Sequence, residues 1–293
     1  MHIPVLLNEV IRMIDPQPGA LIVDGTMNGG GYAREILSRL NNTGTFLGID
    51  WDSSMIVSAK EWLEEKNGAR IILRKENFAR IPELLLQEKL GLVDGLVLDL
   101  GFSSTQLMSG RGFSFAKSAY EEPLLMTYSD TETPAREILQ QLSEDELAHM
   151  FKTFGEERYA RRIAESIKKS VKPFMTVGAL VEAIETAVPR GYGNQRLNPA
   201  TRTFMALRIY ANHELQNLET LLKALPAIVR PGGKVAIVSF HSLEDRIVKN
   251  YFRDFAHQKL FERMTKKPLT ASDDEVAHNP RARSAKLRSV QKI

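Results

Sequence analysis

Four short apolar runs, each bounded by turn residues, constrain the fold more than any other feature of the chain. They span residues 20–24, 45–50, 70–73 and 95–99, and helical patterns separate the first three. Runs of this length that are rich in branched aliphatic residues are typical of buried strands. Strands that alternate with helices pair in parallel. The pattern therefore predicts an α/β fold, with a mostly parallel, doubly wound sheet that binds ligands at the carboxyl ends of its strands.

A fifth run of the same kind, residues 234–240, comes much later in the chain. The segment before it, residues 201–225, has apolar residues at helical spacing, namely Phe204, Leu207, Leu215, Leu218 and Leu222. The long stretch between the fourth run and this segment reads mainly as helices, which begin near Pro134, Glu144, Glu156 and Val177. We therefore expect a core of residues 1–105 plus 201–293 and an inserted helical domain of residues 106–200.

The turn after the first run is crowded with glycine and reads Asp24-Gly-Thr-Met-Asn-Gly-Gly-Gly31. Glycine lets a ligand approach the backbone because no side chain intervenes. An ordinary tight turn between strand and helix is the equally common alternative. The spacing is not the G-x-G-x-x-G of dinucleotide-binding proteins, since Gly25, Gly29 and Gly30 fall in another register.

Acidic and aromatic residues follow the other runs. Asp50 closes the second run, where a carboxylate can accept hydrogen bonds from both ribose hydroxyls, although capping a helix is an alternative role. Asn77 and Phe78 follow the third run, and Phe78 either lays its ring on an adenine or belongs to the core. Asp99 closes the fourth run. These positions predict one ligand site along the edge of the sheet.

Composition excludes several classes of protein. The chain has no cysteine, which removes disulfide scaffolds, thiolate metal sites, iron–sulfur clusters and cysteine nucleophiles. Its apolar stretches are too short to cross a bilayer, and its N-terminus lacks the pattern of a secretory signal, so a cytoplasmic protein is expected. A net charge of +3 and a pI of about 9.0 are compatible with a polyanionic partner.

Several longer strings carry a resemblance to a known family. They are His2-Ile-Pro-Val-Leu-Leu-Asn-Glu9, Asp99-Leu-Gly-Phe-Ser-Ser104 with Gln106, Arg111-Gly-Phe-Ser-Phe115, Gly155-Glu-Glu-Arg158, Asn198-Pro-Ala-Thr-Arg-Thr-Phe204, Ser239-Phe-His-Ser-Leu-Glu-Asp-Arg-Ile-Val-Lys249 and Asn279-Pro-Arg-Ala-Arg-Ser-Ala-Lys-Leu-Arg288. Together they resemble, nearly end to end, the bacterial small-subunit (16S) rRNA cytosine-N4 methyltransferase family, called RsmH or MraW. The resemblance implies a Rossmann-like sheet that binds S-adenosylmethionine (SAM), an inserted helical domain, and methylation of the exocyclic N4 amine of a cytidine.

The resemblance also implies a set of cofactor contacts, which are Gly30, Gly31, Tyr32, Asp50, Phe78, Asp99 and Gln106. The chain departs from the family pattern in two places. In the first loop, Asn28 replaces a glycine and Tyr32 replaces a histidine. In the segment 123–130, Leu125 and Thr127 replace an acid and an arginine.

Methyl transfer from SAM requires no metal, because the sulfonium already makes the methyl group electrophilic; positioning supplies most of the catalysis. The cytosine amine is a poor nucleophile and must lose a proton, so groups that accept its hydrogens can help. The candidates are Asp99, Ser103, Ser104 and His241, and Phe102 is a candidate contact for the base. Asp99 could instead bind the cofactor, and His241 could serve only in local hydrogen bonding. We expect no metal site. Ser242 is better explained as the cap of a helix, since Ser242-Leu-Glu-Asp245 matches a capping box.

Basic residues that would suit RNA phosphates are distributed over three regions. They are Arg158, Arg161, Arg162, Lys168, Lys169, Arg190, Arg196, Arg202, Arg281, Arg283, Lys286 and Arg288. Each alone is better explained as a solvated surface charge, whereas the set would suit a small ribosomal subunit with its target base unpaired or flipped out. The alternative is a catalytically impaired ribosome-assembly protein that binds SAM and RNA on the same fold. A nicotinamide dehydrogenase is disfavoured by the glycine spacing, and the oligomeric state stays open, with a homodimer as one option.

Overall fold

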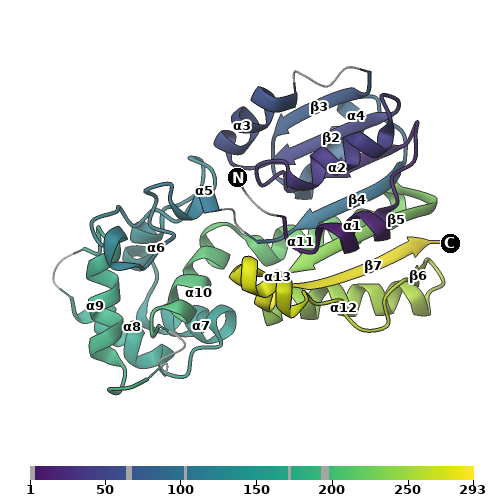
Figure 1. The fold of residues 1–293 in the computed structure, drawn as a ribbon. Coiled ribbons are helices and arrows are strands. Elements are labelled where there is room, and N and C mark those ends of the chain that lie inside the picture. The colour runs from purple at the N-terminus through teal and green to yellow at the C-terminus, as the bar shows by residue number, and fades with distance from the viewer. Residues whose placement is uncertain (1–3, 64–67, 102–103, 171–172, 193–197) are drawn as a thin grey trace. The chain divides into compact units, whose positions relative to one another are not determined.

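A computed structural model describes residues 4–63, 68–101, 104–170, 173–192 and 198–293 of the chain (Figure 1). The chain divides into two compact units, which we describe separately. The sheet unit comprises Met1–Phe102 and Leu215–Ile293, and the helical unit comprises Ser103–Glu214. The two segments of the sheet unit are therefore far apart in sequence and joined through the helical unit.

The sheet unit holds a seven-stranded sheet with the order β3-β2-β1-β4-β5-β7-β6. Its strands are β1 (Leu21–Asp24), β2 (Thr45–Asp50), β3 (Arg70–Lys75), β4 (Val93–Asp99), β5 (Val229–Ser239), β6 (Phe261–Arg263) and β7 (Lys286–Lys292). β1 to β5 pair in parallel, whereas β7 pairs antiparallel with both β5 and β6. The predicted mostly parallel α/β sheet is confirmed, and the antiparallel pair β6 and β7 adds two strands that the sequence analysis did not predict.

Both faces of the sheet are buried, as a parallel sheet requires. Successive residues of one strand belong to different apolar layers: Ile22 packs in one layer and Val23 in the other, as do Phe46 and Leu47. The first layer is completed by α1 (Leu7–Ile14), α2 (Gly31–Leu40) and α3 (Ser53–Leu63), and the second by α4 (Ile81–Gln87), α11 (Glu214–Ile228) and α12 (Ser242–His257) (Figure 1). This alternation explains why the strands read as continuous apolar runs.

The helical unit has its own apolar core. Its helices are α5 (Ser104–Leu107), α6 (Ala135–Gln141), α7 (Glu144–Gly155), α8 (Ala160–Lys169), α9 (Val177–Ala187) and α10 (Thr201–Ala211). α7 begins with a capping box in which Ser143 and Glu146 satisfy each other's backbone N–H groups. The helix expected near Glu156 begins at Ala160, because Glu156 adopts a left-handed conformation that ends α7.

The segment 201–225 differs from the single helix that its periodicity predicts. It is interrupted after α10, where His213 has a φ of 50°. The buried side chain of Asn212 donates to the carbonyl of Met126 and accepts from the N–H of Tyr128, each at 2.8 Å. Phe204 and Leu207 then pack in the helical unit. α10 thus belongs to the helical unit, which ends at Glu214 and not at residue 200, because these contacts hold it there.

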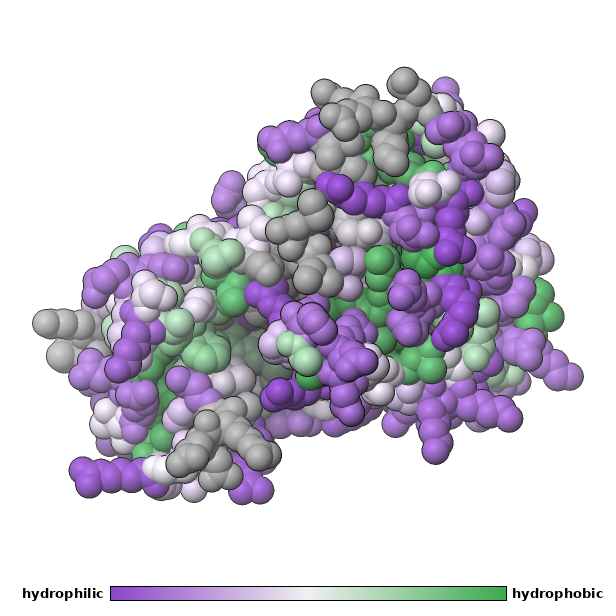
Figure 2. Space-filling model, in the orientation of Figure 1, coloured by the Kyte–Doolittle hydropathy of each residue, from purple (hydrophilic) through white to green (hydrophobic). Residues whose placement is uncertain are grey.

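None of the helices in the described ranges is long and apolar enough to cross a membrane. The face drawn in Figure 2 carries hydrophilic residues over both units, interspersed with smaller apolar areas.

A short helix, α13 (Asp273–His278), and the following turn of 3-10 helix, Pro280–Ser284, lead into β7. Ala282 and Ala285 pack in the same layer as α1 and α2.

Candidate active site

Three aspartates lie at the carboxyl ends of three adjacent parallel strands. Asp24 ends β1, Asp50 ends β2 and Asp99 ends β4, and β1 pairs with both of the other strands. Their exposed fractions are 0%, 6% and 3%, respectively. The sheet order reverses between β1 and β4, and open α/β sheets bind their ligands at such a point. We call these three residues the acidic cluster.

Within the part of the chain that the structure describes, two oxygens of the acidic cluster have no hydrogen-bond partner, Oδ2 of Asp24 and Oδ1 of Asp99. Burial and, to a smaller extent, the charge of Glu244 raise the pKa of Asp99 to about 7, against the opposing effect of hydrogen bonds with Gly101 and Asn28. Burial also raises the pKa of Asp24 well above its ordinary value, with smaller contributions from the charges of Asp99 and Asp50. A buried carboxylate without partners is unfavourable, and a bound cation would relieve it.

The glycine-rich turn is left-handed at three successive residues. The φ angles are 42° at Asn28, 84° at Gly29 and 83° at Gly30. Asparagine tolerates this region better than other residues with a Cβ, which accounts for its presence where the family has glycine. The Asn28 side-chain amide donates to the carbonyls of Asp99 (3.1 Å) and Gly101 (3.0 Å), and its backbone N–H donates to Oδ2 of Asp50 (3.1 Å). Asn28 therefore ties the turn to two members of the acidic cluster.

Gly31 and Tyr32 are explained largely by packing within the sheet unit. A Cβ on Gly31 would lie 2.8 Å from the ring of Pro4, so only glycine fits there. The Tyr32 side chain is 2% exposed, and its hydroxyl donates a short hydrogen bond to the carbonyl of Val5. The Tyr32 ring thus anchors the N-terminal segment, and its peptide group is the part that a ligand at the turn can meet.

Phe78 lies next to the glycine-rich turn. It opens the 3-10 turn Phe78–Arg80, which the Asn77 side chain caps by accepting from the N–H of Ala79 at 2.9 Å. A Cβ on Gly25 would lie 3.2 Å from the Cβ of Phe78. Phe78 is half-buried against the second apolar layer. It meets the core on one side and remains partly accessible beside the turn.

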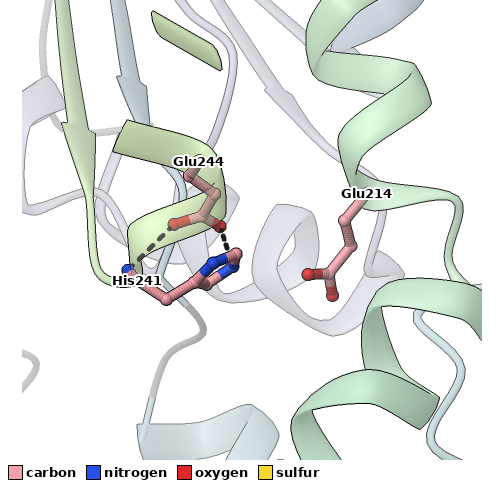
Figure 3. Close-up of side chains that lie close together, drawn as sticks. All are labelled: Glu214, His241 and Glu244. Atoms are coloured by element: carbon pink, nitrogen blue, oxygen red, sulfur yellow. Dashed lines mark hydrogen bonds and ion pairs between the residues drawn. The ribbon is translucent and has the colours of Figure 1, made fainter. Parts of the chain in front are cut away.

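His241 occupies the N-cap position of α12, one residue earlier than the predicted N-cap Ser242. The buried Glu244 carboxylate accepts from the N–H groups of Phe240 (3.0 Å) and His241 (3.4 Å), and its Oε1 lies 3.0 Å from Nε2 of the His241 ring (Figure 3). Nδ1 of His241 is buried and makes no hydrogen bond to any residue in the described ranges. Glu214, also drawn in Figure 3, belongs to the helical unit.

The prediction that Asp245 completes the cap was wrong, because its carboxylate has other partners. Arg288 donates to both Asp245 oxygens, at 2.7 and 3.2 Å, and Lys286 lies 3.3 Å away. Burial alone would raise the pKa of Asp245, but the charges of Arg288 and Lys286 lower it below its ordinary value. Arg288 is 11% exposed, so this member of the RNA-contact set serves the packing of β7 against α12.

The remaining predicted site residues lie either outside the described residues or in the helical unit. Phe102 and Ser103 lie outside the described residues, as does Arg196. Ser104 opens α5 and Gln106 is 4% exposed in the same helix of the helical unit.

The family departure at 123–130 also lies in the helical unit. Thr127 is buried, and the Arg111 guanidinium donates to the carbonyls of Thr127 (3.3 Å) and Tyr128 (3.4 Å). The N–H of Met126 donates to the carbonyl of Arg111 at 2.8 Å. Arg111, from one of the family blocks, thus holds this segment through its backbone, which does not depend on the replaced side chains.

The acidic cluster fits the cofactor that the sequence analysis expected. SAM carries a sulfonium and an ammonium, and the cluster offers carboxylate oxygens that lack donors. Each unsatisfied buried polar atom costs about 1–3 kcal/mol, so a cationic ligand would gain from filling the site. The Asp50 carboxylate accepts from the backbone N–H groups of Asn28 (3.1 Å) and Asp52 (2.9 Å), which fixes its orientation at the glycine-rich turn.

Comparisons with known proteins identify the family of the chain. The family model described as the MraW methylase family matches residues 1–293. A protein named ribosomal RNA small subunit methyltransferase H from Syntrophotalea carbinolica is 42% identical over 312 residues, which cover 100% of this chain and 98% of that protein. Proteins of the same name from Geotalea daltonii and Heliobacterium modesticaldum are 42% and 39% identical, with the same shares of each chain covered.

Proposed function

Because the chain belongs to the MraW methylase family, we propose that it is a SAM-dependent methyltransferase that modifies the exocyclic N4 amine of a cytidine in small-subunit rRNA. The observation that carries the proposal is the acidic cluster at the reversal point of the sheet, with its two unpaired oxygens. Further support comes from relatives named ribosomal RNA small subunit methyltransferase H that align over the whole chain. The alternative of an impaired assembly protein is not favoured.

In this proposal the cofactor is held by the backbone at Gly30, Gly31 and Tyr32, by Asp50 at the ribose, by Phe78 at the adenine, and by Asp99 and Gln106. SAM supplies an electrophilic methyl group when bound. The residues of the chain position the amine and take up its proton. We propose Asp99 or His241, whose ring lies 3.0 Å from the Glu244 carboxylate, as the group that accepts this proton.

The sheet unit is then the cofactor-binding part and the helical unit the part that recognises the substrate. The partner is rRNA within the small ribosomal subunit, in the cytoplasm. The target base must leave any stack to reach the cofactor, since a methyltransferase cannot attack a base inside a duplex.

The test is methyl transfer to small ribosomal subunits that lack the modification. Purified protein and isotopically labelled SAM should yield N4-methylcytidine in nucleoside mass spectrometry of the subunit RNA. Asp50→Ala, which removes the proposed ribose acceptor, serves as the control that should lose SAM affinity in calorimetry. Wild-type protein that binds SAM and subunits but leaves no methyl mark would disprove the proposal and favour the assembly role.

A further inference from the structure

The basic residues of the helical unit differ in whether their charge already has a partner. Nζ of Lys168 donates to the carbonyls of Leu139 and Gln140 at the end of α6. Lys169 pairs with Glu165, and Arg161 lies 3.4 Å from Asp145. These three cations serve local structure, so their contribution to binding a polyanion is reduced.

Arg162 and Arg202 of the same unit form no ion pair with a carboxylate among the described residues, and each contacts a tyrosine. The Arg162 guanidinium carbon lies 5.7 Å from the centre of the Tyr159 ring. Nη1 of Arg202 donates to the hydroxyl of Tyr192 at 3.0 Å. Arg162 is exposed and Arg202 is half-buried. An arginine without an acidic partner keeps its full charge and most of its donors for a ligand.

The two tyrosines form one fixed pair. Their ring centres are 4.7 Å apart with an angle of 87° between the planes. The buried Glu157 carboxylate holds both residues, because its Oε1 accepts from the N–H of Tyr159 and from the hydroxyl of Tyr192, each at 2.7 Å. Burial and the Glu157 carboxylate raise the pKa of Tyr192, which keeps its phenol protonated as a donor. Both rings are only half-buried, so they remain partly accessible.

We infer that Tyr159, Arg162, Tyr192 and Arg202, which we call the tyrosine–arginine patch, bind a single-stranded segment of the RNA substrate. The inference rests on the proposed function and names the surface that recognises the substrate. Aromatic rings stack on unpaired bases, and arginine forks match phosphate oxygens; both features occur here within one network. An acidic protein is the alternative ligand of this patch. It would pair with the two arginines, but it has no bases to stack on the two tyrosine rings.

Two of the family blocks meet in this network, although they are far apart in sequence. Glu157 comes from the block Gly155-Glu-Glu-Arg158 and Arg202 from the block that begins at Asn198. A Cβ on Gly155 would lie 2.6 Å from the carbonyl oxygen of Arg202, so glycine permits α7 and α10 to approach this closely. This close packing brings the start of α10, which carries Arg202, beside the end of α7, which Glu157 follows.

The test measures binding of a fluorescein-labelled single-stranded oligoribonucleotide, about 12 nucleotides long, by fluorescence anisotropy at several KCl concentrations. Arg162→Gln should weaken binding on the order of tenfold and lower the salt slope by about 0.7. Tyr159→Leu should weaken it by a similar factor with little change in slope, because it removes stacking and not charge. The matched control is Arg161→Gln, which removes the same charge from the neighbouring position of α8 and should change affinity less than about twofold.

Three outcomes would overturn the inference. These are equal losses for Arg162→Gln and Arg161→Gln, an unchanged affinity for Tyr159→Leu, and competition by polyglutamate as effective as that by unlabelled RNA. Thermal melting and SAM affinity of each variant separate misfolding from lost contacts. Failure of the proposed function is recognised independently, because wild-type protein would then bind the oligonucleotide through the patch and still leave small subunits unmethylated.

Discussion

At the residue scale, two buried carboxyl groups, Asp24 and Asp99, would gain from a cationic ligand. Asp24 and Asp99 each lack a donor for one oxygen, and neither has a basic residue as a partner among the hydrogen bonds and ion pairs of the described chain. Desolvation raises the pKa of both groups because it penalises the charged form. A bound cation reverses this penalty. Ligand binding and proton release are therefore coupled at this site.

The coupling predicts that SAM affinity decreases as the pH is lowered from 8 to 6. Asp99 has a pKa of about 7 in the free protein, so near pH 6 about nine-tenths of the molecules carry a proton that a cation must expel. We expect affinity about tenfold weaker at pH 6 than at pH 8. Calorimetry in buffers of different ionisation enthalpy measures the released proton directly. Asp99→Asn in the same buffers corrects for titration of SAM itself, and an equal pH dependence in that variant would contradict the coupling.

A second prediction concerns Asn28, whose side chain joins the glycine-rich turn to the end of β4. Asn28→Ala loses two hydrogen bonds and keeps a Cβ at a φ of 42°, so it should reduce the free energy of unfolding by about 2 kcal/mol. Asn28→Gly loses the same bonds but relieves the backbone, and should cost about 1 kcal/mol less than the alanine variant. Urea denaturation compares the two. Equal losses would show that the left-handed backbone contributes nothing.

At the scale of elements, the parallel strands could be predicted because each is an apolar run that ends at a turn. The acids at the ends of β1, β2 and β4 could be predicted for the same reason, since a parallel sheet brings those ends to one edge. β6 and β7 could not, because short antiparallel strands with charged residues such as Lys286 and Arg288 resemble exposed chain. The packing role of Tyr32 could not be predicted, because its hydrogen-bond partner Val5 lies far from it in sequence. The sequence analysis therefore assigned Tyr32 to the cofactor alone.

Helix boundaries were predicted less well than strands. The cap of α12 shifted by one residue because Asp245 is drawn to Arg288 on β7, a contact between distant segments. The break between α10 and α11 depends on Asn212 bonding to Met126 and Tyr128, which no local pattern reveals. Periodicity identifies a helical face, but long-range contacts decide where the helix ends.

The ion pair between Asp245 and Arg288 gives a prediction for the junction of α12 and β7. Both side chains are nearly buried, at 12% and 11% exposure. Asp245→Asn leaves the guanidinium without its counter-charge and should lower the free energy of unfolding by about 3 kcal/mol. Arg253→Ala, which removes an exposed arginine of α12 beside Asp254, should change it by less than about 0.5 kcal/mol. Chemical denaturation compares the two variants, and similar losses would contradict the structural role of the pair.

At the scale of the whole molecule, the chain inserts a continuous unit into a discontinuous one. The helical unit runs from Ser103 to Glu214 without interruption, whereas the sheet unit needs two separate segments to complete its sheet. β5 follows the insertion in sequence and pairs with β4, which precedes it. The sheet is therefore incomplete until both segments are present. A single continuous fragment can therefore contain the whole helical unit, but no fragment that omits the helical unit can contain the whole sheet.

The helical unit should fold when residues 103–214 are produced alone. Its core is made from α6 to α10, and residues such as Phe151, Ile163 and Leu180 are fully buried within it. A unit of this size with its own apolar core is in the range of independently stable domains. The fragment should show helical circular dichroism and a cooperative urea transition, and Phe151→Ala should weaken it by about 3–5 kcal/mol. A fragment of residues 1–102 is the matched control and should not fold, because its sheet lacks β5 and β7. A non-cooperative transition of the helical fragment would contradict its independence.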